Sequence, residues 1–357
     1  MKNKNLVTVL LIASFFLGFS IWSIFGKTPD YSESERRVLA KFPEVTAETL
    51  LSGKFSKEFE TYSVERFPLR DGWRSIKAYV RTGVFAQKDN HDIYVADGHI
   101  SKLEYPMNKD MIYHATDVFE KVRDTYLKDN EIYLAVIPDK NRYLAEKNGY
   151  LSMDYELFNK AVRSRMEYAT YIEIADLLEY NDYYQTDSHW KQEAIVDVAE
   201  RIGSKMGVDV KSDYKKSKLE TSFYGVYKGQ SARMHSADHI TYLTNKAIEL
   251  AKVEGAEAVY DMQKAEGRDP YEMFLSGTQP VVTIKNEQNN TGKRLIVFRD
   301  SFGSSIAPLL LVGYEEIVLV DLRYIPSDLL GEYVEFSDAD ILFLYSTMLL
   351  NNSLSMK

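Results

Sequence analysis

Residues 294–305 read RLIVFRDSFGSS, and this stretch decides the fold. Residues 294–298 form a short, dense apolar run, which is typical of a strand buried on both faces of a parallel sheet. A helix is predicted to begin at Ser304, so the residues between form a tight strand-to-helix turn. Runs of the same kind predict further strands at 131–138, 316–322 and 339–345. Such strands, followed by helices, indicate a doubly wound α/β sheet, whose sites form at the carboxyl ends of the strands.

Amphipathic helices and shorter strands account for most of the remaining chain. Apolar residues at three- and four-residue steps predict helices over 47–84, 110–128, 157–171 and 191–206. We expect a hairpin and two short strands, at 93–100, 172–175 and 239–244. Residues 208–238 are polar, and we expect them to be irregular.

The N-terminus carries an uncharged apolar run at 6–25, LVTVLLIASFFLGFSIWSIF. This run matches the about 20 residues that a helix needs to cross a bilayer. We predict a retained signal anchor at 1–27, followed by a charged stalk at 28–45 and one large domain at 46–357. The alternative is a cleaved signal peptide, whose apolar region is usually shorter, about 7–15 residues.

Composition excludes several classes of protein. The 357 residues include no cysteine, which rules out thiol nucleophiles, disulfides, Cys-ligated zinc and iron–sulfur clusters. A formal net charge of -9 argues against a general nucleic-acid-binding protein. The hydrophobic fraction of 45% is that of an ordinary globular protein.

Two motifs fall where this fold places its sites: Asp187-Ser188-His189 before a predicted helix, and Ser301 in the strand-to-helix turn. Acyl transfer by serine needs a base, a carboxylate that orients the base, and donors for the oxyanion. We predict that Ser301 is the nucleophile, His189 the base and Asp187 the carboxylate, with Asp300 as a competing carboxylate. The alternative is structural, because Thr186 or Asp187, and likewise Asp300, could simply cap the helix that follows.

A cluster of acidic and histidine side chains upstream is a weaker candidate site. Its members lie in turn-rich sequence around the predicted hairpin, namely Asp89, His91, Asp92, Asp97 and His99. A metal site is the alternative here, but we interpret these as turn residues and expect neither a metal nor a cofactor.

Taken in order, seven segments resemble the DHHW family, which is related to the alginate O-acetylation proteins of the SGNH hydrolase-like group. They are SESERRVLAKFP (32–43), VERFPLRDGWRSIKAYV (64–80), IYVADGHI (93–100), VIPDKNRY (136–143), TDSHW (186–190), YEMFLSGTQP (271–280) and FRDSFGSS (298–305). The resemblance implies a three-layer α/β/α fold with a mostly parallel sheet and a permuted motif order.

The resemblance also implies roles for individual residues. Asp187, His189 and Ser301 match the family's triad, and Ser188 stands where the family name has a histidine. Further residues are predicted near the oxyanion or the substrate: Ser276, Gly277, Thr278, Arg299 and Tyr345.

The implied function is O-acetylation of an exported or cell-wall polysaccharide by a membrane-anchored domain outside the cytoplasm. The implied partners are the polysaccharide acceptor, the membrane itself and a multi-spanning membrane acyltransferase, with no nucleic acid. Two alternatives stay open: an acetylesterase acting on the same polymers, and a polysaccharide-binding scaffold without activity.

Overall fold

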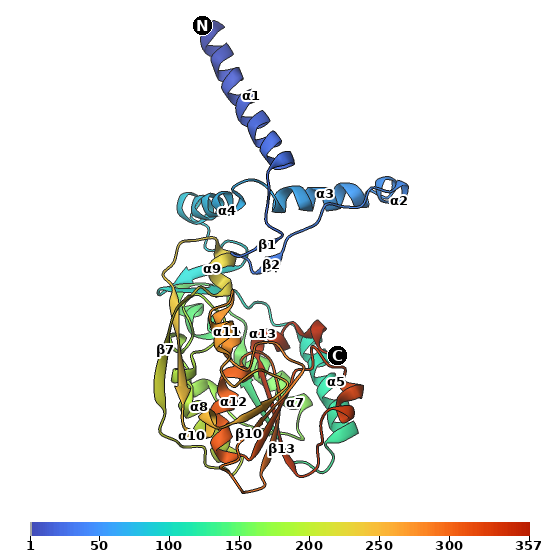
Figure 1. Cartoon of the computed structure of the whole chain (residues 1–357), viewed down its shortest axis with the longest axis vertical. Coiled ribbons are helices and arrows are strands. Elements are labelled where there is room, and N and C mark those ends of the chain that lie inside the picture. The colour runs from blue at the N-terminus through green and yellow to red at the C-terminus, as the bar shows by residue number, and fades with distance from the viewer. Residues whose placement is uncertain (1) are drawn as a thin grey trace. The chain divides into compact units, whose positions relative to one another are not determined.

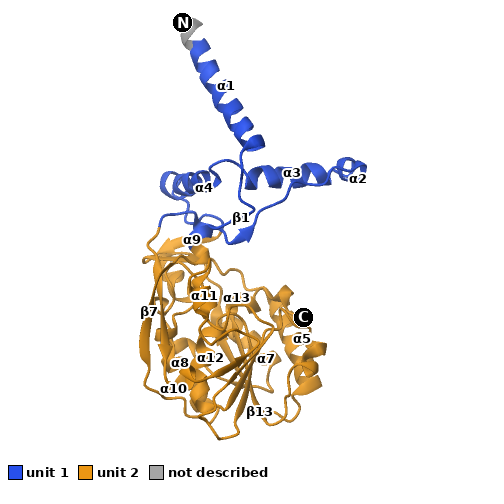
Figure 2. Ribbon diagram, in the orientation of Figure 1, with its two compact units in different colours: residues 1–91, 228–234 blue, residues 92–227, 235–357 orange. Residues whose placement is uncertain are grey.

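The computed structural model describes residues 2–357, with side chains from residue 5 onward. The chain forms two compact units (Figure 2). The first contains the residues up to His91 together with Lys228–Met234, and the second contains Asp92–Tyr227 and His235–Lys357. The predicted boundaries of anchor, stalk and large domain stay predictions.

The first unit is mainly helical. Its elements are α1 (Lys2–Phe25), β1 (Tyr31–Ser32), β2 (Arg37–Val38), α2 (Ala47–Leu51), α3 (Lys54–Glu65), α4 (Arg70–Tyr79) and a π-helical turn (Val80–Val84). The single helix predicted over 47–84 is therefore wrong. The chain breaks at Gly53, in the left-handed region at φ 74°, and again after Pro68, where Leu69 has φ 56°.

Helix α1 contains a segment, Asn5–Phe25, that is long and apolar enough to cross a membrane. Its mean hydropathy is 2.2, and none of it is buried against the rest of the chain. A signal sequence near the N-terminus can pass the same test of length and hydropathy, so both predicted alternatives for the N-terminus remain.

The second unit is built on a seven-stranded sheet in the order β6-β5-β13-β11-β12-β10-β9. The first five strands in this order are parallel to their neighbours, and β10 is antiparallel to both β12 and β9. The strands are β5 (Ile132–Ile137), β6 (Thr170–Tyr171), β9 (Lys252–Glu254), β10 (Val281–Lys285), β11 (Arg294–Arg299), β12 (Glu316–Val320) and β13 (Ala339–Ser346).

Helices cover both faces of this sheet (Figure 1). Along β11, Leu295 and Val297 pack with α8 (Val196–Lys205) and α12 (Gly303–Leu310). Ile296 and Phe298 point to the other face and pack with α5 (Lys109–Tyr126) and α7 (Tyr155–Arg165). Successive side chains therefore enter opposite cores, which explains why the strand is apolar throughout. The predicted three-layer α/β/α fold is confirmed.

Two antiparallel hairpins lie outside the main sheet. The first, β3 (Ile93–Ala96) with β4 (His99–Lys102), is the predicted hairpin. The second pairs β7 (Lys215–Phe223) with β8 (Asp238–Thr244), which corrects the expectation that 208–238 would be irregular. The β7 strand has mostly exposed side chains, so it lacks the apolar signal of a buried strand.

Short elements complete the unit and adjust two other predictions. The strand expected at 172–175 lies at β6, two residues earlier, and the helix expected over 191–206 is a 3-10 turn (Gln192–Ala194) followed by α8. The remaining α-helices are α6 (Asn141–Leu144), α9 (Val226–Ser231), α10 (Lys246–Glu249), α11 (Met262–Ala265) and α13 (Thr347–Leu350).

Candidate active site

Ser301 lies in the turn between β11 and α12, and the turn is held from both sides. The Asp300 carboxylate accepts the backbone N–H of Phe302 at 3.1 Å and that of Ser346, at the end of β13, at 2.9 Å. A Cβ on Gly303 would lie 2.6 Å from the Cβ of Arg299, so only glycine permits so tight a turn. Asp300 therefore positions the nucleophile's turn, and both of its oxygens are occupied by backbone donors.

His189 connects Ser301 to Asp187 by two short hydrogen bonds. Its Nε2 lies 2.7 Å from the Ser301 Oγ, and its Nδ1 lies 2.6 Å from the Asp187 Oδ1. With the proton on Nδ1 donated to the carboxylate, Nε2 is free to accept the serine proton. The ring of Tyr271 stacks on the imidazole at 3.9 Å between centroids, which restricts its rotation. Side chains from two distant parts of the sequence thus form one hydrogen-bonded chain.

The Asp187 carboxylate is fixed by the backbone around it. Its Oδ1 accepts the N–H of His189 at 3.1 Å, and its Oδ2 accepts the N–H of Val226 at 2.9 Å. Gly225 approaches so closely that a Cβ there would lie 2.3 Å from the Asp187 Cβ and 2.4 Å from the Thr186 carbonyl oxygen. The predicted alternative of a helix cap does not describe Asp187, because Lys191 is the residue that precedes the next helical turn.

A buried lysine fixes the backbone of the segment that carries Asp187. The Lys140 Nζ donates to three backbone carbonyls, those of Tyr184 at 2.9 Å, Gln185 at 3.3 Å and Asp187 at 2.7 Å. Burial lowers the pKa of Lys140 to about 7, although the charge of Asp187 acts in the opposite direction. On the other side, Asp238 accepts the backbone N–H groups of Gln185 and Thr186, each at 2.8 Å.

Sequence reasoning missed most of these supporting residues. Gly225 and Asp238 belong to the stretch that was expected to be irregular, and Tyr271 opens the segment 271–280, in which roles were predicted only for Ser276, Gly277 and Thr278. Lys140 lies in the family-like segment 136–143, but no role was predicted for it. Each of them acts through a backbone group or a ring face, for which a sequence carries no motif.

The loop predicted at Ser276, Gly277 and Thr278 has contacts of its own. The Ser276 hydroxyl donates to Asp261 at 2.8 Å, Gly277 has φ 78°, and Thr278 is exposed. Within the described residues, no hydrogen bond joins this loop to Ser301 or His189. The segment reaches the site instead through Tyr271, and a contact of the loop with substrate stays a prediction.

Arg299 and Tyr345 are both buried near the ends of their strands. An Arg299 guanidinium nitrogen lies 3.6 Å from Asp321, and burial lowers the pKa of this arginine. The Tyr345 ring stacks with Phe119 of α5 at 5.1 Å, in the core on that face of the sheet. Neither side chain has a hydrogen bond to Ser301 or His189 among the described residues, so their substrate roles also stay predictions.

Three of the five upstream acidic and histidine residues contact other side chains. Asp97 pairs with Lys147 at 2.8 Å, and His99 contacts the Tyr180 ring edge-on at 5.2 Å. His91 lies 3.1 Å from the Lys77 ammonium. Among the residues that the structure describes, no group of three or more His, Asp or Glu is placed to hold a metal ion.

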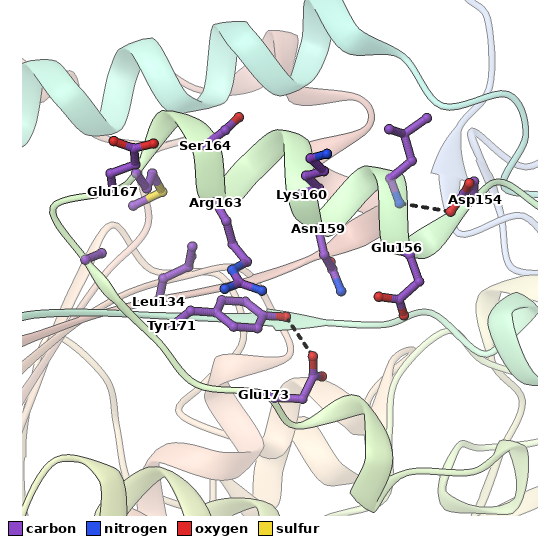
Figure 3. Close-up of a pocket in the computed structure, with 13 residues that line it drawn as sticks. Leu134, Asp154, Glu156, Asn159, Lys160, Arg163, Ser164, Glu167, Tyr171 and Glu173 are labelled. Atoms are coloured by element: carbon purple, nitrogen blue, oxygen red, sulfur yellow. Dashed lines mark hydrogen bonds between the residues drawn. The ribbon is translucent and has the colours of Figure 1, made fainter.

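An open groove of about 810 Å³ runs beside α7 and the edge strand β6, apart from these residues (Figure 3). The guanidinium of Arg163 lies over the Tyr171 ring at 4.7 Å, and the Tyr171 hydroxyl donates to Glu173 at 3.4 Å. None of the residues predicted for the active site lines this groove.

Comparison with known proteins gives likenesses in structure. No family model matches the chain, and no curated protein matches it. A DHHW family protein from Eubacterium siraeum is 21% identical, with a TM-score of 0.54 over 74% of this chain and 93% of that chain. PatB1 of Bacillus cereus, solved with a sulfonyl adduct, is 16% identical, with a TM-score of 0.56 over 72% and 95%. The O-acetyltransferase domain of Pseudomonas putida AlgJ is 11% identical, with a TM-score of 0.44 over 72% and 92%.

These neighbours match the relation that the sequence motifs indicated. A DHHW family protein is among them, as the resemblance implied. At these levels of identity the likeness establishes the fold, and the chemistry has to be argued from the residues of this chain.

Proposed function

We propose that this protein is a serine acyltransferase that acetylates hydroxyl groups of a polysaccharide outside the cytoplasm. The observation that carries the proposal is the hydrogen-bonded chain from Asp187 through His189 to Ser301, with links of 2.6 and 2.7 Å. Such a chain activates an oxygen nucleophile, because the imidazole removes the serine proton and the carboxylate stabilises the imidazolium that forms. The structural likeness to an O-acetyltransferase domain agrees with this chemistry.

In the first half of the reaction, the Ser301 Oγ attacks the carbonyl carbon of an acetyl donor while His189 Nε2 takes its proton. We assign the backbone N–H of Ser301, at the start of the turn into α12, as a donor to the oxyanion. The tetrahedral intermediate then collapses, the bond to the donor's leaving group breaks, and His189 returns the proton to that group. Ser301 is left as an acetyl ester.

In the second half, a sugar hydroxyl attacks the acetyl ester and gives its proton to His189. The new ester forms on the sugar, the bond to Ser301 breaks, and the serine oxygen recovers its proton from His189. Water in place of the sugar would make the protein an esterase, and the same residues would serve. Transfer and hydrolysis therefore differ only in which acceptor reaches the acetyl group.

The proposal also includes the location of the protein at a membrane. α1 anchors the chain in the membrane as a single span, and the large domain works on the outer side, where exported polysaccharides are found. Acetyl-CoA is absent there, so we infer that a multi-spanning membrane acyltransferase supplies the acetyl group. Neither a metal nor a cofactor takes part in the proposed steps.

The test is hydrolysis of a nitrophenyl acetate by the full-length protein. We expect Ser301→Ala and His189→Ala each to lower kcat by about 10³-fold or more. Ser164→Ala, an exposed serine of α7, is the matched control and should keep wild-type activity. Wild-type rates in both site variants would refute the assignment.

Adding a soluble oligosaccharide acceptor then separates the two reactions, because transfer yields an acetylated sugar and hydrolysis yields acetate.

A further inference from the structure

Helix α4 and the turn after it present an apolar stripe to the outside of the first unit. The stripe follows three- and four-residue steps, so its members share one face of the helix. Their side chains are between 36% and 73% exposed, and they are Leu69, Trp73, Ile76, Val80 and Val84. In a helix on the surface of a soluble protein, this is the face that would be buried.

The charged face of the same helix packs inward. Arg74 pairs with the Glu35 carboxylate at 3.4 Å and donates to the Gly229 carbonyl at 2.9 Å, and Arg70 also pairs with Glu35. The Glu35 side chain is only 16% exposed. All of these residues belong to the first unit. The usual arrangement is therefore inverted, with ion pairs inside and apolar side chains outside.

Helix α3 also exposes apolar side chains. None of its residues is buried, yet Phe55, Phe59 and Tyr62 lie on one face, where their rings contact Phe42. Phe42 is 56% exposed and Phe59 is 42% exposed. A cluster of aromatic rings on the surface is what a membrane interface accommodates, because that region offers both apolar and polar surroundings.

These apolar surfaces begin where the spanning segment ends. The Phe19 ring of α1 stacks on Phe67 at 5.6 Å and contacts Trp73 edge-on at 6.1 Å. Within the first unit, α3 and α4 run across the C-terminal end of α1 (Figure 2). Aromatic contacts thus lead from a helix fit to cross a bilayer to α4 and to Phe67, which lies between α3 and α4.

We propose that α3, α4 and the turn to Val84 form a collar that lies in the lipid headgroup region of the membrane which α1 crosses. This rests on the membrane location given under the proposed function. The stripe of α4 and the rings of α3 would enter the lipid to a depth of about 5–10 Å, as interfacial helices do. On the face of α4 that points away from the lipid, the ion pairs of Glu35 hold this helix to the rest of the first unit. The apolar surface of the collar continues the apolar surface of α1, so lipid is the molecule that covers it.

Because the chain has no cysteine, a single introduced cysteine can carry a fluorophore at one chosen position. We would label Ile76→Cys and Val84→Cys in the collar, Leu11→Cys within α1, and Lys128→Cys as the exposed control in the second unit. The full-length protein is reconstituted into phosphatidylcholine and phosphatidylglycerol vesicles whose acyl chains are brominated at defined depths. Acetylesterase activity is measured on the same samples.

We expect positions 76 and 84 to lose about half of their fluorescence with shallow bromines and less with deep ones, as an interfacial depth requires. Leu11→Cys should be quenched most by deep bromines, and Lys128→Cys by neither. Quenching at position 11 without quenching at 76 and 84 would overturn the collar alone, and would indicate a protein partner for that surface. Loss of quenching at position 11 would overturn the membrane location, and with it the collar. Activity in these variants shows separately whether the Ser301 chemistry is intact.

Discussion

Replacing Gly225 by alanine tests whether the position of Asp187 controls the reaction. The added Cβ would lie 2.3 Å from the Asp187 Cβ, whereas carbon atoms pack at about 3.5–4.0 Å. The segments must therefore separate by about 1.2 Å or more. Displacements of about 1 Å in a catalytic group cost about 10²-fold in rate, or about 2.7 kcal/mol of activation free energy. We expect that loss in kcat for Gly225→Ala.

The assay is hydrolysis of a nitrophenyl acetate, with folding followed by circular dichroism and thermal melting. Overpacking of this kind costs about 1–3 kcal/mol in stability, so the variant should remain folded. Gly72→Ala is the matched control, because nothing lies within 4 Å of a Cβ at that position and its activity should not change. In an Asp187→Ala background, Gly225→Ala should have almost no further effect on kcat. A folded Gly225→Ala protein with wild-type kcat would refute the reasoning.

Two further predictions concern the buried titratable groups Lys140 and Glu104. Lys140→Met removes the donor that holds the Asp187 carbonyl at 2.7 Å, so kcat should fall by about tenfold, the worth of one such hydrogen bond. Lys128→Met, at an exposed position, should leave kcat unchanged, and an unchanged rate in Lys140→Met would contradict the positioning role. Burial, followed by the charge of Asp139, raises the pKa of Glu104 from 4.5 to about 7, so the folded state retains a proton that the unfolded chain has lost. Its contribution to stability is therefore complete below pH 4.5 and is lost as the pH rises through about 7. Glu104→Gln should flatten this fall in urea titrations at several pH values, and an unaltered pH dependence would argue against a raised pKa.

The sheet could be predicted from sequence because its strands are buried on both faces. Leu295 and Val297 enter one core while Ile296 and Phe298 enter the other, so the whole run is apolar and stands out. The β7 strand has no such signal, since its side chains are mostly exposed and its pairing with β8 depends on distant residues.

In the region 47–84, the sequence predicted one long helix where the structure has several shorter ones. Its apolar spacing is helical throughout, yet the chain turns at Gly53 and Leu69, both at positive φ. Spacing alone does not show where a helix ends when the apolar face continues beyond the break. The inverted polarity of α4 could not be read from the sequence either, because the partners of Arg70 and Arg74 lie far away in the chain.

The candidate site could be predicted as far as its reactive side chains. Ser301, His189 and Asp187 come from two recognisable motifs, and the structure brings them into hydrogen-bond contact. Their supports were not predictable, because Gly225 acts by having no side chain and Lys140 acts on backbone carbonyls.

The most direct test of the central claim is to trap the acyl-enzyme. The full-length protein would be mixed with a nitrophenyl acetate, quenched in acid and digested, and its peptides mapped by mass spectrometry. We predict an acetyl group on Ser301 that is absent from His189→Ala and that disappears when an acceptor is added before the quench. Acetylation of a different residue, or equal acetylation of Ser301 in His189→Ala, would contradict the proposed chemistry.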